Sequence, residues 1–170
     1  MKHSIQTRIV LSFGLLILII GAALTAANSL EAVLSMGRLQ QSMLETQVSS
    51  NASAARMYLK DVYGSLSIKD EVLYAEDGTP IEGDNALVDM LQQDLGVVAT
   101  IFVADGSDFR RISTNILTED GSRAVGTTLG TDSAAYYGIS AGKRFFGKAT
   151  ILGKPYLSSY DPLIMGGRVQ

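Results

Sequence analysis

The chain of 170 residues contains no cysteine and a single histidine, and both shortages narrow its chemistry. Without cysteine there is no disulfide framework, no thiolate nucleophile and no cysteine-based metal site. His3 lies before a long hydrophobic run, so no imidazole base is available to the rest of the chain. Phosphate-loop and dinucleotide-binding patterns are also missing. We therefore expect neither an enzyme nor a cofactor-dependent or metal-dependent protein.

Two short patterns imitate functional sites. Residues 138–142, Gly-Ile-Ser-Ala-Gly, match the elbow of serine hydrolases, but that elbow needs a strand before its serine and a helical run precedes Ser140. Asp105 and Asp108 flank Gly106 as in a calcium loop, yet the further oxygen ligands of such a loop are missing. We interpret the first as a chance match and the second as a turn.

Strongly basic segments are missing as well. The isoelectric point is near 5.1 and no basic run alternates with aromatic residues, which excludes a typical nucleic-acid-binding protein. Residues 28–107 contain 12 acidic and 4 basic side chains, whereas residues 108–170 contain 5 acidic and 8 basic ones. The basic, glycine-rich second half suits a small anion, although an ordinary solvated surface would have the same composition.

One hydrophobic run is long enough to cross a membrane. Ile9 to Ala27 contains no charge over 19 residues, and a helix of this length rises about 28 Å. We predict a transmembrane helix over residues 9–28. Lys2 and Arg8 precede it, so residues 1–8 are expected in the cytoplasm and the rest of the chain outside. A cleaved signal peptide is the alternative, because the run ends in small residues.

A helical pattern continues beyond the hydrophobic run. Apolar and small residues recur every three or four positions between Leu30 and Val62, and Gly64 ends the pattern. We predict a helix over residues 29–64, continuous with the membrane span, followed by a domain over residues 65–170 that is truncated at its carboxyl end. Because the helix stripe is only partly apolar, it is expected to pack on the domain and, in part, on a second copy. The predicted assembly is a homodimer.

The domain is predicted to be α+β. Val97 to Ala104 is apolar or β-branched on both faces, which is typical of a central strand, and a glycine turn joins it to a second strand in a hairpin. A helix with a glycine stop leads into this hairpin, and a short helix and a second hairpin follow it. The predicted elements are a helix at 86–95, strands at 97–104 and 109–115, a helix at 132–140 and strands at 145–152 and 156–164.

Alternation along these strands gathers polar side chains on shared faces. A period of two places Arg111 and Ser113 on one face of their strand, where a buried cation requires a partner. Arginine offers a planar fork to a carboxylate, lysine adds a mobile charge, and tyrosine hydroxyls donate hydrogen bonds without charge of their own. We predict one cavity for a small organic anion, although each residue alone also fits a sheet surface. The predicted ligand-binding residues are Arg111, Ser113, Lys148, Thr150, Tyr156 and Tyr160.

Five blocks of this sequence, in this order and spacing, resemble the extracytoplasmic sensing region of bacterial methyl-accepting chemotaxis proteins and related receptors. The resemblance is to the Cache superfamily, in the single-Cache form also described as a Cache3/Cache2 fusion. The blocks are Gly96–Phe102, Asp108–Asn115, Glu119–Thr127, Gly147–Thr150 and Tyr156–Leu163.

The resemblance implies a PAS-like antiparallel sheet, with a long amino-terminal helix across one face and a small-molecule pocket on the other. It also implies a dimeric receptor with a second membrane span and a cytoplasmic signalling region, which senses small metabolites such as organic acids. A closing strand of the sheet is expected after Gly167, beyond the end of the given chain.

Three alternatives stay open at this point. The sensing region could belong to a histidine kinase or a cyclase instead of a chemoreceptor. A pilin-like structural subunit also runs a hydrophobic helix into a sheet domain, but pilins resemble one another in an acidic residue within that helix, which the run from Ile9 to Ala27 lacks. A secreted enzyme with its signal peptide attached is disfavoured by the missing histidine.

Overall fold

The computed structural model describes residues 35–169. The chain divides into two compact units, which meet between Thr46 and Gln47. The described part of the first unit, residues 35–46, is helical, and the second unit begins with helical residues 47–63 and contains all the strands. The predicted tail at 1–8 and the predicted span at 9–28 lie outside the described residues. Among the residues that are described, no helix has the length and apolar content to cross a membrane.

The amino-terminal helix, described over residues 35–63, ends where the sequence predicts. The amide of Gly64 donates to the carbonyl of Lys60 at 2.9 Å, and Gly64 has a φ of 66°, a left-handed conformation that favours glycine. The side chain of Glu76 fills the space that a Cβ at this position would need. Its carboxylate also accepts from the amide of Ser65 at 2.9 Å, so the helix end is tied to the loop that follows β2.

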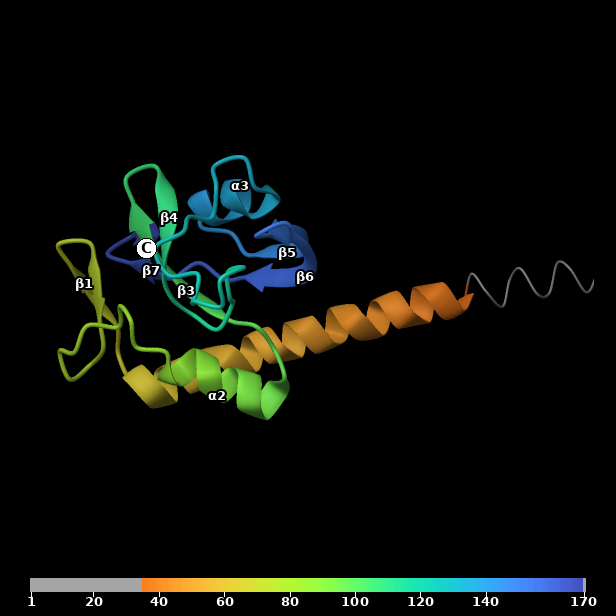
Figure 1. Cartoon of the computed structure of the whole chain (residues 1–170), viewed down its shortest axis with the longest axis horizontal. Coiled ribbons are helices and arrows are strands. Elements are labelled where there is room, and N and C mark those ends of the chain that lie inside the picture. Colours follow the sequence, from red (N-terminus) through yellow and green to blue (C-terminus); the bar gives the residue numbers. More distant parts are fainter. Residues whose placement is uncertain (1–34, 170) are drawn as a thin grey trace, which may run out of the picture. The chain divides into compact units, whose positions relative to one another are not determined.

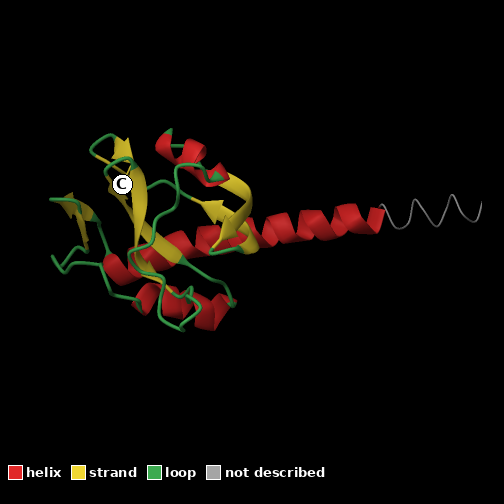
Figure 2. Ribbon diagram, turned by 45° about the horizontal axis from the view of Figure 1, so that its top comes forward, coloured by secondary structure: helices red, strands yellow, loops and turns green. Residues whose placement is uncertain are grey.

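Helix α2 (Ala86–Leu95) lies beside the last turns of the amino-terminal helix (Figures 1 and 2). Leu87 and Leu91 are buried in the core, and the hydroxyl of Tyr58 donates to the carboxylate of Asp94 at 2.9 Å. Gly96 ends α2 with a φ of 67°, which confirms the predicted boundary. The residue at the amino-terminal cap is Asn85, and the carboxylate of the preceding Asp84 accepts from the amide of Ala86 at 2.9 Å.

The eight strands of the described residues pair as four antiparallel hairpins. Figure 1 shows β3, β4, β5 and β6 between α3 and α2. An α+β fold with a long helix and antiparallel pairing is therefore confirmed, whereas one continuous sheet is not present among the described strands. β3 was expected to be central, yet it pairs only with β4. The pairs are β1 (Ser67–Lys69) with β2 (Val72–Tyr74), β3 (Thr100–Asp105) with β4 (Asp108–Thr114), β5 (Phe145–Ile151) with β6 (Lys154–Tyr160), and β7 (Ile164–Met165) with β8 (Arg168–Val169).

The second edge of β4 is covered by the connection that leads to α3. The amide of Arg111 donates to the carbonyl of Thr127 at 2.8 Å, and the amide of Gly126 donates back to the carbonyl of Arg111 at 2.8 Å. The amide of Leu129 donates to Phe109 in the same way at 2.9 Å. β4 is consequently hydrogen-bonded on both edges, and its last four residues are buried. This rigid position fixes where the Arg111 side chain begins.

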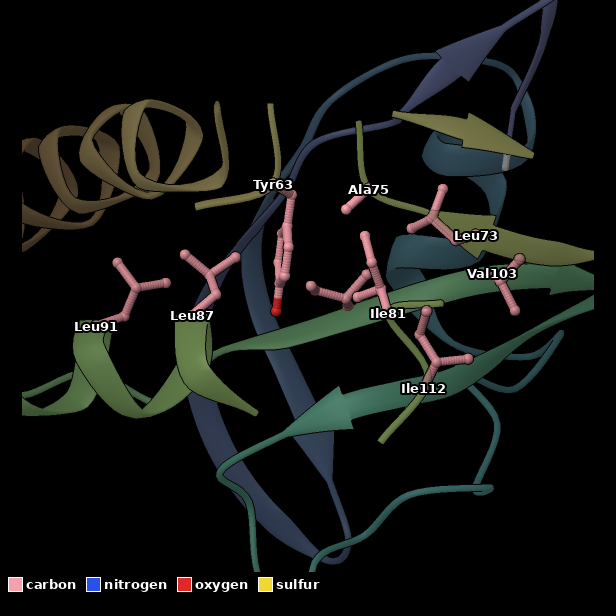
Figure 3. Packing of buried hydrophobic residues seen from close by; sticks show 9 residues of the cluster. Tyr63, Leu73, Ala75, Ile81, Leu87, Leu91, Val103 and Ile112 are labelled. Atoms are coloured by element: carbon pink, nitrogen blue, oxygen red, sulfur yellow. The ribbon is translucent and has the colours of Figure 1, made fainter. Parts of the chain in front are cut away.

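The hydrophobic core lies between α2, the end of the amino-terminal helix and one face of the β3–β4 hairpin. Figure 3 shows Leu87 and Tyr63 next to one another, with Ile112 and Val103 projecting from the hairpin. Ile112 and Val103 are each 1% exposed. Because burial of apolar side chains contributes roughly 1.5–3 kcal/mol each, this cluster anchors the hairpin to the helices.

The remaining elements follow the predicted order. α3 (Ala134–Ser140) begins at Ser133, whose hydroxyl accepts from the amide of Tyr136 at 3.2 Å, and it lies against β5. Its Gly138 comes close to Phe145, so that a Cβ there would lie 3.5 Å from the Phe145 Cβ. The turn between β5 and β6 is formed by Leu152 and Gly153, which is earlier than the expected turn at 153–155.

Candidate ligand-binding site

The second unit contains a cavity of about 520 Å³. Its walls come from the amino-terminal helix between Val48 and Leu59, from β3 with the loop before it, from β4 and from β6. Most of the lining side chains are apolar. Those that carry a charge are Arg56, Arg111 and Asp161.

Two unbroken stretches of backbone border this cavity. Residues Gly96–Phe102 and Tyr156–Leu163 all contribute to its lining. A strand that presents only one face lines a cavity with alternate residues, so an unbroken run indicates that the strand also presents its edge. The first three residues of β3 and the stretch Tyr156–Tyr160 of β6 therefore border the cavity with a strand edge as well as a face.

Arg111 projects from β4 into the cavity. Arg111 and Phe102 are cross-strand partners, and the guanidinium carbon lies 4.8 Å from the centroid of the Phe102 ring. Only 3% of Arg111 is exposed, and it forms no ion pair with any of the residues described. One terminal guanidinium nitrogen donates to the hydroxyl of Thr127, whereas the Nε has no hydrogen-bond partner among these residues. A buried cation with an unused donor is a binding group for an anion.

Burial perturbs the titration of two groups in this cavity. Desolvation lowers the pKa of Arg111 below its usual value, and the nearby phenol of Tyr160 opposes this shift only in part. Desolvation also raises the pKa of Tyr160, against the influence of the Arg111 charge. Arginine nonetheless stays protonated and tyrosine stays neutral at physiological pH, so the site presents one positive charge and a neutral donor.

Tyr156 and Tyr160 lie in the cavity lining together with Arg111, whereas their role as ligand-binding residues stays a prediction. The two tyrosines are four residues apart on β6 and share one face of that strand. The Tyr160 ring lies between two phenylalanines, with centroids 6.3 Å from Phe102 and 6.0 Å from Phe145. These contacts fix the ring, so that the phenol is held close to the guanidinium.

Ser113 does not share this cavity. The pairing register shifts between Ile101 and Phe102, so that β4 has one extra residue, Ile112, between the partners of these two residues. Ser113 consequently pairs with Ile101 and faces α2, where its hydroxyl donates to the Asn85 side chain at 3.3 Å. Strict alternation placed Ser113 beside Arg111, and the β-bulge reverses that placement.

Lys148 and Thr150 also lie outside the cavity lining, and both are exposed. Lys148 pairs with Leu157, and Thr150 pairs with Pro155. Directly opposed residues of antiparallel strands share a face. Lys148 and Thr150 are therefore on the opposite face of the hairpin from Tyr156 and Tyr160, which pair with Ala149 and Phe145. The residues that share a face within each strand were predicted correctly. Which face of β5 lies on the same side as which face of β6 depends on the pairing register, and alternation along one strand does not give that register.

The sequence reasoning missed Thr127. Its hydroxyl accepts from the Arg111 guanidinium and donates to the carbonyl of Ala124 at 2.8 Å. Thr127 lies in the connection between β4 and α3, and its hydroxyl orients the Arg111 guanidinium. It is therefore a positioning residue. Thr127 ends the block Glu119–Thr127 in a glycine-rich segment, but neither feature indicates contact with β4.

A second charged group lies where β6 leaves the cavity. The carboxylate of Asp161 accepts from the Nε of Arg144 and lies 3.8 Å from a terminal nitrogen of Arg56 on the amino-terminal helix. Asp161 follows Tyr160 directly, so this ion-pair cluster joins the strand that carries Tyr160 to the helix.

Comparison with known families agrees with the resemblance noted above. The family described as the Cache 3/Cache 2 fusion domain matches residues 22–169. No curated protein and no solved structure matches the chain.

Proposed function

We propose that this chain, which belongs to the Cache 3/Cache 2 fusion family, binds a small organic anion in the cavity beside Arg111. Cache domains are extracytoplasmic small-molecule sensors of signalling receptors, so a sensing role follows from the family itself. The choice of an organic anion as the ligand is ours and rests on the chemistry of the cavity.

The observation that carries this proposal is the isolated charge of Arg111. Burying a cation without an opposite charge costs several kcal/mol, and folded proteins tolerate that cost mainly at functional sites. The neighbouring residue Arg110 shows the ordinary arrangement, because it lies on the other side of the strand and is paired with Glu82 and Asp105. An anion that enters the cavity would give Arg111 the partner that Arg110 already has.

The same cavity offers a route for a signal. Residues of the amino-terminal helix between Val48 and Leu59 line it, so a ligand can favour one position of this helical segment over another. A ligand shifts such an equilibrium only by its difference in affinity for the two arrangements. We propose that the helix segment moves on binding and that the domain serves a transmembrane chemoreceptor. A histidine kinase or a cyclase as the output is the alternative.

This receptor is proposed to be a homodimer in the bacterial inner membrane, anchored by residues 9–28. A chimera tests the signalling part: residues 1–170 joined to the membrane-proximal and methyl-accepting regions of a chemoreceptor should give a swimming response to the ligand. A chimera that binds the ligand without any response would contradict the chemoreceptor reading and leave the binding proposal in place.

Thermal unfolding tests the binding itself. The whole chain is screened against carboxylates, phosphates and sulfonates, together with their neutral amide or alcohol counterparts. A ligand at a hundredfold excess over its Kd contributes about 2.7 kcal/mol, which raises the Tm by roughly 5–10 °C. We expect such a rise with an anion and none with its neutral counterpart. An equal response from the Arg111→Gln variant would remove Arg111 from the site.

A further inference from the structure

The charges that line the cavity limit the charge of its ligand. Three charged side chains contribute to the lining: Arg56, Arg111 and Asp161. Asp161 is already engaged by Arg144 and by Arg56, and the Arg56 side chain is 51% exposed. Arg111 is the buried one and lacks an acidic partner among the described residues. The Asp161 cluster has two cations for one carboxylate, but both of these arginines are partly exposed to solvent, so Arg111 is the one buried, uncompensated charge of the described lining.

We call one part of the lining the Arg111 end of the cavity; it is formed by Phe102, Phe109, Arg111, Leu129, Ile139, Tyr156 and Tyr160. The other cation of the described lining, Arg56, is half-exposed and lies 3.8 Å from the carboxylate of Asp161. Lys148, the nearest lysine along β5, lies on the opposite face of its hairpin from both tyrosines. Arg110 is engaged by Glu82 and Asp105 on the other side of β4. A second negative charge at this end would consequently be buried without a counter-charge.

No free carboxylate is available for an ammonium group either. Asp161 is the one acidic residue in the described lining, and two arginines compensate it. Apart from the guanidinium, the Arg111 end consists of aromatic and aliphatic side chains with tyrosine hydroxyls. Such walls bury apolar ligand surface and leave charged substituents without partners.

From these observations we propose that the cavity selects a monoanion with an uncharged, apolar body, such as an aliphatic or aromatic monocarboxylate. The carboxylate meets the Arg111 guanidinium and the Tyr160 phenol, and the body packs against Phe102, Phe109 and Ile139. Dicarboxylates and α-amino acids are rejected, because their additional charge is desolvated without a partner. This inference rests on the proposed function and specifies its ligand.

Four compounds with the same six-carbon chain separate the contributions of the individual charged groups. Hexanoate has one carboxylate, hexanamide has none, adipate has a second one, and norleucine adds an α-ammonium group. Titration calorimetry on the whole chain should give a Kd for hexanoate at least tenfold lower than for each of the other three. The heat of hexanoate binding should disappear in Arg111→Met and persist in Arg110→Met, a change of the same residue type one position away.

The outcomes distinguish this inference from the proposed function. Adipate or norleucine binding as tightly as hexanoate, with the same dependence on Arg111, would overturn the monoanion inference and leave anion sensing intact. Hexanamide binding as tightly as hexanoate would overturn both, and so would the absence of binding by every anion of the thermal screen to the folded chain. If Arg111→Met fails to unfold cooperatively, the selectivity of the native chain among the four compounds still decides the inference.

Discussion

The guanidinium of Arg111 lies over the ring of Phe102, 4.8 Å from the ring centroid, and the two residues are directly opposed on β4 and β3. A cation over an aromatic face gains roughly 0.5–2 kcal/mol, the larger value where water is excluded. This gain offsets only part of the cost of burying the charge. The arrangement orients the guanidinium in the cavity without neutralising it.

Replacing Arg111 by methionine should stabilise the ligand-free protein while abolishing its response to an anion. The change removes a buried charge and keeps a long side chain in contact with Phe102, so we expect the free energy of unfolding to rise by about 1 kcal/mol or more. Urea denaturation without ligand measures this quantity. A loss of stability would mean that the guanidinium is already satisfied within the folded chain.

Replacing Thr127 by valine should weaken anion binding through the position of Arg111. The valine keeps the shape of the side chain but removes the hydroxyl that accepts from the guanidinium. Because a hydrogen bond to a charged group contributes about 1.5–3 kcal/mol, we expect a roughly tenfold or greater increase in Kd, measured by calorimetry. Thr127→Ser retains the hydroxyl and should bind nearly as the native chain does. Equal weakening by both substitutions would point to lost packing instead.

Tyr63 should make the stability of the domain depend on pH above 10. Burial raises the pKa of Tyr63 to about 12, and the nearby charge of Asp84 adds to this shift. The folded state thus holds this proton more tightly than the unfolded chain. The contribution of this phenol to the free energy of unfolding is therefore fully present below pH 10. About 2–3 kcal/mol of it is lost as the pH rises through 12.

The Tyr63→Phe variant separates the contribution of this phenol from that of the lysine side chains, which titrate in the same pH range. Urea unfolding at pH 9 and at pH 12 should show a smaller loss of stability in Tyr63→Phe than in the native chain. The control is Tyr137→Phe, because Tyr137 is 72% exposed and should follow the native behaviour. An identical pH dependence in all three proteins would show that the Tyr63 phenol ionises as freely as an exposed one.

Asn115 should be one of the most costly side chains to truncate. Its carbonyl accepts from the amide of Ala99 at 2.8 Å, and its amide group donates to the carbonyls of Val88 at 2.7 Å and Val97 at 3.2 Å. Asn115→Ala removes these three hydrogen bonds and takes from the Ala99 amide its side-chain acceptor, at about 1–3 kcal/mol for each buried group left unsatisfied. We expect a loss of roughly 3 kcal/mol in urea unfolding, against a small effect of truncating the exposed Gln93. A loss below 1 kcal/mol would show that water replaces these contacts.

The sequence predicts local structure well wherever side-chain chemistry acts over a few residues. Gly64 and Gly96 end their helices in left-handed conformations, as expected from glycine after an apolar pattern. Arg111 and Tyr160 were identified because alternation within a strand is a local property. In contrast, the β-bulge at Ile112 is a property of the pairing between β4 and β3. Alternation along β4 alone therefore could not reveal that the Ser113 side chain faces α2.

Cross-strand register explains the other differences. Whether Lys148 or Ala149 shares a face with Tyr156 depends on the length of the turn at Leu152 and Gly153, which is shorter than the sequence suggested. Thr127 is beyond prediction for a similar reason, because its contact with Arg111 joins a loop to a strand 16 residues away. Long-range pairing, and not residue type, decides both cases.

The position of a bound anion would show directly whether Arg111 holds its carboxylate. A crystal structure of the protein with 6-bromohexanoate would locate the bromine by its anomalous scattering and the carboxylate by its density. We expect the carboxylate oxygens within hydrogen-bond distance of the Arg111 guanidinium, and the bromine among Phe102, Phe109 and Ile139. A carboxylate held elsewhere, for example by Lys148 on the outer face of β5, with Arg111 still unpartnered, would contradict this expectation.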